Sequence, residues 1–351
     1  MEQLNNLASS FKTRRFRIPM GLAALIVAGS VIFYWGAPNS LLTVTQAAQR
    51  AGAGLSKEVV DVNGAPVTYL KGGDGEAVIL LHGIYAEKDH WDQVAGQLTD
   101  DFLVIAPDIP GFGESGMPEG GSYSYDQQVG RLHDFLRALK LSRYHLVGNS
   151  MGGAIAGAMA ARWPEETLSL SFFGGAPRVP GAKPGDMERI IASGGPSPMV
   201  VTSEAEYFQR FDFIFHEMPF IPTPILNLWA ARDAADPEKN RRIWHEVGNE
   251  HAADFPNSIP RISTPTLILW GDMDRVFDVS GASALQKQIQ HSQIHILEET
   301  GHLPMLERPS ESGAFLRRFL LEHKQKSTAD PKAGVSSRAG SDPSANFLSG
   351  F

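Results

Sequence analysis

One serine lies within a run of small residues, Gly148-Asn149-Ser150-Met151-Gly152, directly after an apolar stretch. The G-x-S-x-G spacing is typical of a nucleophile elbow, in which a strand turns sharply into a helix and holds the serine in a strained backbone conformation. Small neighbours permit this turn, and the free N–H groups at the start of the helix face any oxyanion that develops. Because a strand pattern precedes the motif and a helix pattern follows it, we interpret Ser150 as a nucleophile.

A serine hydroxyl is a weak nucleophile and needs a base that a third group orients. Among the 11 histidines, His302 follows the last expected strand, where a loop can reach over the sheet edge toward Ser150. The acid is expected between them, in the chain order Ser…Asp/Glu…His. Asp272 and Asp274 both follow the apolar strand Leu267–Trp270. Either carboxylate could orient His302, and turn capping is the alternative role for both.

The oxyanion hole of such a site needs a second N–H donor from the loop after the third strand. The segment LLHGIYAEKDHW supplies His82, Gly83 and Ile84 at this position, and glycine lets the backbone approach a substrate closely. We predict that the backbone N–H groups of Ile84 and Met151 bind the oxyanion. His82 lies at the buried end of the strand, so we interpret it as a structural hydrogen-bonding residue and not as a second base.

From Val59 onward, strand and helix patterns alternate, which predicts an α/β fold with helices on both faces of a mostly parallel, eight-stranded sheet. The expected strands are Val59–Val62, Val67–Leu70, Ala77–Leu81, Phe102–Ala106, Tyr144–Val147, Leu168–Phe173, Thr266–Trp270 and Gln293–Leu297. The expected helices are Asp89–Leu98, Tyr125–Leu139, Met151–Arg162, Ser280–Gln290 and Glu311–Leu321.

Three other regions break this alternation. Residues 177–260 are crowded with Pro, Phe, Trp and Met, which we interpret as a helical cap inserted between the core segments 57–176 and 261–323. Gln46 to Lys57 is small and polar and is expected to be a connector. Residues 324–351 have little to bury, so a disordered tail is expected there.

The N-terminal residues 1–45 have the character of a short cytoplasmic stub followed by a transmembrane anchor. Ile18–Trp35 carries no charge and is long enough to span a bilayer as a single helix. The basic residues before it should stay in the cytoplasm and place the catalytic domain on the other side, in the periplasm of a bacterium; they are Lys12, Arg14, Arg15 and Arg17. A cleaved signal peptide is the alternative.

Composition excludes several functional classes. The chain of 351 residues has 31 basic and 39 acidic side chains, a net charge of −8, which argues against a nucleic-acid partner. It contains no cysteine, so disulfides, thiolate metal sites and cysteine nucleophiles are excluded. Neither a cofactor nor a metal is expected, and the oligomeric state is left open.

Five motifs occur in the order of the α/β-hydrolase fold superfamily, which the chain resembles from about Lys57 to His323. They are HGIYAEKDHW, PDIPGFGES, GNSMGG, WGDMDRVFDVSGA and GHLPMLERP. Within the superfamily, GDMDRVFDVSGASAL and the cap are similar to the membrane-anchored monoacylglycerol lipases and related bacterial lipases and esterases. In that pattern the second aspartate is the acid, which implies Asp274 and leaves Asp272 structural. Epoxide hydrolases and dehalogenases carry aspartate at the elbow, so Ser150 argues against both.

The resemblance implies a serine carboxylic-ester hydrolase that acts on lipid-like esters through an acyl-enzyme intermediate. An apolar cap would cover the acyl chain, and an anchor would hold the site near the membrane. A C–C bond hydrolase or an acyltransferase could use the same triad. A binding protein that keeps the hydrolase architecture without turnover is the alternative from another class.

Overall fold

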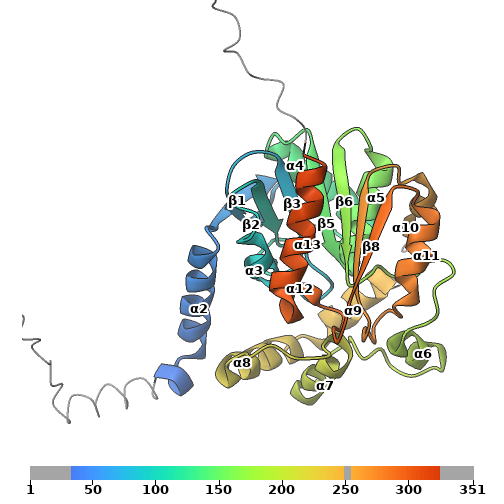
Figure 1. The fold of residues 1–351 in the computed structure, drawn as a ribbon. Coiled ribbons are helices and arrows are strands. Elements are labelled where there is room, and N and C mark those ends of the chain that lie inside the picture. The colour runs from blue at the N-terminus through green and yellow to red at the C-terminus, as the bar shows by residue number, and fades with distance from the viewer. Residues whose placement is uncertain (1–32, 249–253, 325–351) are drawn as a thin grey trace, which may run out of the picture.

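A computed structural model describes residues 33–248 and 254–324, and its centre is one eight-stranded sheet (Figure 1). The strand order is β1-β2-β4-β3-β5-β6-β7-β8. β2 pairs antiparallel with β1 and β4, whereas all other neighbours are parallel. The strands are β1 (Ser56–Val62), β2 (Ala65–Gly72), β3 (Ala77–Leu81), β4 (Leu103–Pro107), β5 (Tyr144–Asn149), β6 (Thr167–Phe173), β7 (Thr266–Gly271) and β8 (Ser292–Leu297). All eight expected strands are therefore present.

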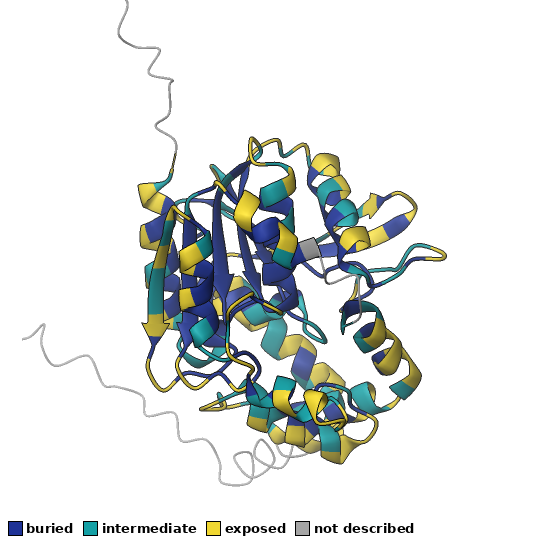
Figure 2. Cartoon of the chain, turned by 90° about the vertical axis from the view of Figure 1, so that its right-hand side faces the viewer, coloured by how far each residue is buried: buried dark blue, intermediate teal, exposed yellow. Residues whose placement is uncertain are grey.

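Helices cover both faces of the sheet, as the alternating pattern predicts. One face carries α4 (Tyr125–Ala138), α5 (Met151–Arg162) and α11 (Ser280–Gln288), and the other carries α3 (Asp92–Ala95), α12 (Pro304–Glu307) and α13 (Pro309–Glu322). The side chains of β3 alternate between the two cores: Ile79 packs with α4 and α5, and Leu80 with α3 and α13. A strand buried on both faces reads as a continuous apolar run, which explains the uniformly buried central strands in Figure 2.

The segment expected as one helix from Asp89 to Leu98 is shorter and divided. A 3₁₀ turn, η1 (Lys88–Trp91), leads into α3, which ends at Ala95. Gly96 follows the end of α3. A Cβ added at this glycine would lie 3.1 Å from the Cα of Ala53. The close approach of a neighbouring segment and the low helix propensity of glycine end the helix early.

The range expected as a cap, 177–260, contains α6 (Asp186–Ala192), α7 (Glu204–Ile214), α8 (Thr223–Ala234) and α9 (Pro237–Gly248), which lie below the sheet in Figure 1. Within the range expected as cap, α10 (Asp254–Ser258) contacts the core: the ring of Phe255 lies 5.9 Å from that of Phe172 on β6. A short 3₁₀ turn, η3 (Ile259–Arg261), then leads into β7.

The expected connector from Gln46 to Lys57 is wrong in its first half, because α2 (Pro38–Gly52) runs through it. A proline at the start of α2 favours helix initiation, and the side chain of Leu42 is buried. Contacts outside the helix hold its other end: Arg50 forms an ion pair with Asp89 at 2.6 Å. Tertiary contacts of this kind are not visible in a local sequence pattern.

Most of the expected span Ile18–Trp35, and the tail from residue 325 onward, lie outside the described residues. Within residues 33–248 and 254–324, no helix is both long and apolar enough to cross a bilayer.

Candidate active site

Ser150 lies between β5 and α5 with φ 55° and ψ −116°, the positive φ expected of a strained elbow. Glycine is required on both sides of it. A Cβ on Gly148 would lie 2.2 Å from the carbonyl oxygen of Gly152, and a Cβ on Gly152 would lie 2.4 Å from that of Leu81. The sequence motif thus reflects backbone atoms packed too closely for any side chain.

His302 and Asp274 are brought together by the loops that follow β8 and β7. The Nδ1–H of His302 donates to Oδ2 of Asp274 at 2.9 Å, and both side chains are buried. The other carboxylate oxygen accepts the backbone N–H groups of Val276 at 2.8 Å and Phe277 at 3.0 Å. Asp274 is thereby fixed, and Nε2 is left as the ring nitrogen that can act as a base.

Asp272, the other candidate acid, is exposed. Its Oδ1 accepts the backbone N–H of Thr300 at 3.3 Å, which is a turn-stabilising contact. The structure therefore brings Asp274, and not Asp272, to His302.

Asn149 connects the elbow to the histidine loop, a role that the sequence analysis missed. Its Nδ2 donates to the carbonyl of Phe173 at 2.8 Å and to that of His302 at 3.1 Å. Gly174, with φ 60°, makes room for this approach, since its Cβ would lie 2.0 Å from the His302 carbonyl oxygen. The residue beside the nucleophile thus holds the main chain of the base.

The segment expected to complete the oxyanion hole lies against the elbow. A Cβ on Gly83 would be 3.4 Å from the Cβ of Ser150. His82 donates from Nδ1 to the Gly83 carbonyl at 2.7 Å, and its Nε2 accepts the N–H of Ile109 at 2.9 Å. The carbonyl of Gly83 and the N–H of Ile84 belong to one planar peptide and point in opposite directions, so this hydrogen bond also orients the Ile84 N–H.

His82 is fully buried, which lowers its pKa and keeps the ring neutral. Both of its ring nitrogens are engaged, in agreement with the expected structural role.

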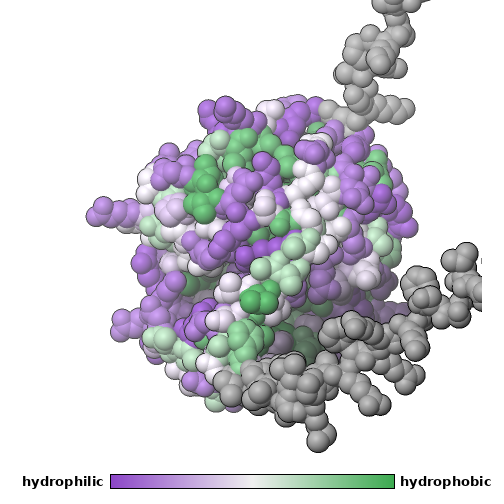
Figure 3. Space-filling model, turned by 90° about the vertical axis from the view of Figure 1, so that its left-hand side faces the viewer, coloured by the Kyte–Doolittle hydropathy of each residue, from purple (hydrophilic) through white to green (hydrophobic). Residues whose placement is uncertain are grey.

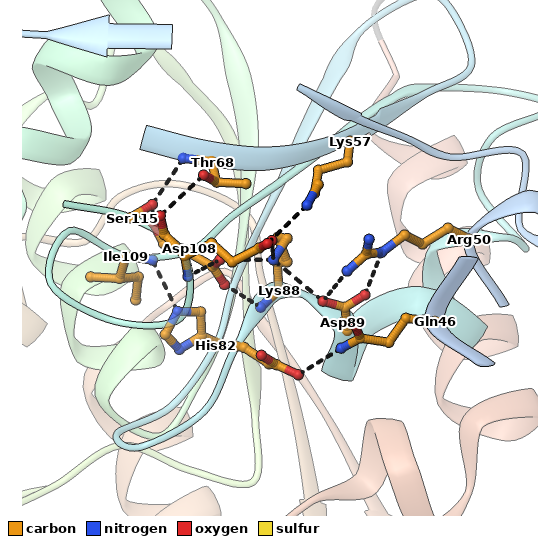
Figure 4. A network of polar contacts seen from close by, with 12 residues as sticks. Gln46, Arg50, Lys57, Thr68, His82, Lys88, Asp89, Asp108, Ile109 and Ser115 are labelled. Carbon is orange, nitrogen blue, oxygen red and sulfur yellow. Dashed lines mark hydrogen bonds and ion pairs between the residues drawn. The ribbon is translucent and has the colours of Figure 1, made fainter. Parts of the chain in front are cut away.

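A polar network centred on the buried side chains of Lys88 and Asp108 adjoins the oxyanion segment (Figure 4). Lys88 forms ion pairs at 2.8 Å with Asp108 and with Glu114. Burial alone would lower the pKa of Lys88, but these carboxylates outweigh it and raise the pKa. Asp108 also accepts the backbone N–H groups of Lys88 and Glu114, both at 2.8 Å. The network joins the loops after β3 and β4, and it was not visible from sequence because its members are far apart in the chain.

Two acids beside this network carry pKa values near neutrality. Burial, followed by repulsion from Asp89, raises the pKa of Asp92 to about 8 and that of Glu87 to about 7. Both carboxylate oxygens of Asp92 are buried and lack a hydrogen-bond partner among the described residues. These groups therefore affect stability across the physiological pH range.

The cap contacts both loops of the site. The hydroxyl of Tyr85, which adjoins Ile84 and has φ 55°, donates to the carbonyl of Asn240 on α9 at 2.6 Å. On the other side, the N–H of His302 donates to the carbonyl of Ile214, the last residue of α7, at 2.9 Å. Within the described part of the chain, no group of three or more His, Cys, Asp or Glu side chains is placed to hold a metal ion.

The chain is similar to known proteins in sequence and in fold. The family model for the alpha/beta hydrolase fold matches residues 76–309. Lipase 1 of Psychrobacter immobilis is 30% identical over 75% of this chain and 83% of its own length. Human monoacylglycerol lipase ABHD6 is 30% identical over 71% of this chain and 76% of its own length. A solved structure described as a membrane phospholipase A, a bacterial virulence factor, has a TM-score of 0.78 at 34% identity and covers 87% of this chain and 98% of its own.

Proposed function

Because the chain belongs to the α/β-hydrolase fold family, we propose that it hydrolyses lipid-like carboxylic esters with Ser150, His302 and Asp274 as its triad. The observation that carries this proposal is the hydrogen bond from His302 Nδ1 to Asp274 Oδ2, in a loop that Asn149 connects to the elbow where Ser150 is held at positive φ. Lipases and monoacylglycerol lipases among the relatives support lipid ester hydrolysis by a serine hydrolase.

In the proposed reaction, Nε2 of His302 takes the Ser150 proton while Oγ attacks the ester carbonyl. The N–H groups of Ile84 and Met151 bind the developing oxyanion, and the latter lies at the positive N-terminus of α5. His302 then gives its proton to the leaving alkoxide, which departs as the alcohol and leaves an acyl-enzyme. His302 then deprotonates a water molecule, which attacks the acyl-enzyme carbonyl. As the bond to Oγ breaks, His302 returns the proton to Ser150 and the carboxylic acid leaves.

The cap range 177–260 supports a substrate with an acyl chain. Its helix α7 is rich in aromatic side chains, and in the loop after β7 the ring of Phe277 lies 5.4 Å from that of His302. Apolar walls of this kind favour an acyl chain over a small polar ester. We propose that the core segments 57–176 and 261–323 carry the chemistry and that the cap selects the chain.

We further propose that the N-terminal segment Ile18–Trp35 associates with a membrane. The described residues at its end support this, because Phe33 is 42% and Trp35 59% exposed. Figure 3 views the molecule from the side of α2, where hydrophobic and hydrophilic surface alternate. The similar membrane phospholipase A adds support. Retention in membranes after a carbonate wash, lost on deletion of residues 1–37, would test the association, and release of the unaltered chain by carbonate would contradict it.

Turnover of p-nitrophenyl esters and of a chain-length series of monoacylglycerols tests the proposed activity. Wild-type protein should hydrolyse these esters and react with a fluorophosphonate probe, and Ser150→Ala should do neither. Ser142→Ala, at an exposed serine, is the matched control and should retain both. Ligand binding without turnover would favour the binding protein, and turnover that survives Ser150→Ala would exclude this nucleophile.

A further inference from the structure

One carboxylate, that of Glu307 at the end of α12, joins the histidine loop to the cap. Its Oε1 accepts the backbone N–H of Gly301 at 3.1 Å and that of Leu303 at 3.4 Å, on either side of His302. Its Oε2 accepts the N–H groups of His216 at 2.8 Å and Glu217 at 3.0 Å, in the segment that follows α7. Oε2 also lies 3.1 Å from the Gly301 nitrogen, which shares its N–H between the two oxygens.

The main chain of His302 lies between this carboxylate and the elbow. Its N–H donates to the Ile214 carbonyl of the cap at 2.9 Å, while its carbonyl accepts Nδ2 of Asn149 at 3.1 Å. The fit is close on the cap side as well, because a Cβ on Gly301 would lie 2.6 Å from the His216 nitrogen. The histidine loop thus has contacts on both sides and little room to shift on its own.

We propose that Glu307 is a positioning residue that sets His302 relative to Ser150 by fixing the loop to the cap. This inference rests on the proposed function. The side chain of Glu307 acts only through main-chain N–H groups and does not itself take part in the chemistry. A shift of about 1 Å at a catalytic group far from the mutated atom can cost about a hundredfold in rate, so a small loosening of this contact is sufficient to be measured.

The carboxylate is suited to this task because all of its contacts are donors. An ionised carboxylate offers two acceptor oxygens, and charge-assisted hydrogen bonds are roughly twice as strong as neutral ones. Glutamine has the same shape but only one acceptor oxygen, and its NH₂ group would face N–H donors. Glu307→Gln therefore removes the contact to one side with almost no change in volume.

The test compares Glu307→Gln with Glu311→Gln, which makes the same chemical change at an exposed position four residues later. Each protein is titrated to completion with a fluorophosphonate, and ester turnover is expressed per titrated site, so that a misfolded fraction does not count. We expect Glu307→Gln to lower kcat by about 10- to 100-fold. KM should stay within about threefold, since an interaction that acts on the chemical step alone leaves binding unchanged. Glu311→Gln should match the wild type.

Glu307→Asp is the second variant, because it keeps the charge but is one methylene too short to reach both sides. An intermediate kcat at unchanged KM would support the proposal. A kcat per site within twofold of wild type for Glu307→Gln, or a rise in KM without a fall in kcat, would overturn it. Failure of the proposed function would give a different result: the wild-type protein would neither hydrolyse esters nor react with the fluorophosphonate.

Discussion

The nucleophile and the base are held by different kinds of contact. Ser150 is positioned by main-chain packing, in which Gly148 and Gly152 approach other backbone atoms more closely than any side chain allows. His302 is positioned by hydrogen bonds, to Asp274 through its ring and to Ile214 and Asn149 through its main chain. Close packing of glycine occurs at both residues, but the position of His302 depends in addition on the chemical type of each hydrogen-bond partner. The two halves of the site should therefore fail in different ways when they are changed.

The largest loss of kcat is expected when either the nucleophile or the base is removed. Ser150→Ala and His302→Ala should each lower kcat by about 10⁵-fold or more, and the double variant should be scarcely slower, because the pair acts as one unit. Steady-state ester hydrolysis on folded, purified protein measures this. Losses that add in the double variant would show that the two residues act independently.

The orienting acid comes next. Asp274→Asn should lower kcat by about 10⁴-fold with the fold intact, because the histidine loses the partner that fixes its tautomer and stabilises its protonated form. Asp272→Asn is the matched control and should cost little, since its side chain makes only one contact to a backbone N–H. Circular dichroism checks the fold of both variants. The reverse ranking would identify Asp272 as the acid.

The close packing around Ser150 is tested by adding one methyl group. Gly152→Ala should destabilise the protein by several kcal/mol, since overpacking alone costs about 1–3 kcal/mol and here the clash is with backbone that cannot yield. Gly130→Ala on α4 has no heavy atom within 4 Å of its Cβ and should stabilise by up to about 1 kcal/mol. Thermal unfolding compares them. Equal stability of the two variants would contradict the role given to packing.

The smallest effect on catalysis concerns the buried acid behind the oxyanion segment, which should change the pH dependence of stability. Asp92 has a pKa of about 8 in the folded protein against 3.8 as its ordinary value. Between those values the folded protein binds a proton that the unfolded chain lacks, so stability falls as the pH rises, by at most about 1.4 kcal/mol per pH unit. Asp92→Asn should remove this dependence and be more stable than wild type at pH 8, but not at pH 4.

Melting temperatures at pH 4 and pH 8 measure this difference. The control is Asp74→Asn, at an exposed aspartate, which should keep the wild-type pH dependence. An unchanged slope in Asp92→Asn would show that this carboxylate is already ionised in the folded protein.

The core of the fold and the identity of the family followed from local patterns. All eight strands were predicted because the central ones are short apolar runs and the edge strands β1 and β8 contain alternating apolar residues, and α5 was predicted with its bounds because the elbow marks its start. The comparisons confirm the resemblance to α/β hydrolases and to lipases within them. The pairing of Asp274 with His302 is consistent with the order of the motifs, although the residues alone left Asp272 as an equal choice.

The features that were missed depend on contacts between distant segments. Asn149 lies inside the elbow motif, but its bond to the His302 carbonyl spans 153 residues. The ion pair of Lys88 with Asp108 joins two loops that no periodicity connects. The helix α2 was taken for a connector because it depends on contacts such as the ion pair of Arg50 with Asp89, which lies on another element. A single sequence records none of these pairs.

The α2 helix also has a consequence for orientation. Arg50 is bound to Asp89 at one end of the helix, and Asn39 accepts a hydrogen bond from Arg232 of α8 at 2.6 Å at the other. A helix fixed at both ends is not a flexible linker, so the hydrolase domain has little rotational freedom about α2. Any surface that binds the exposed face of α2 therefore also determines which side of the domain faces that surface.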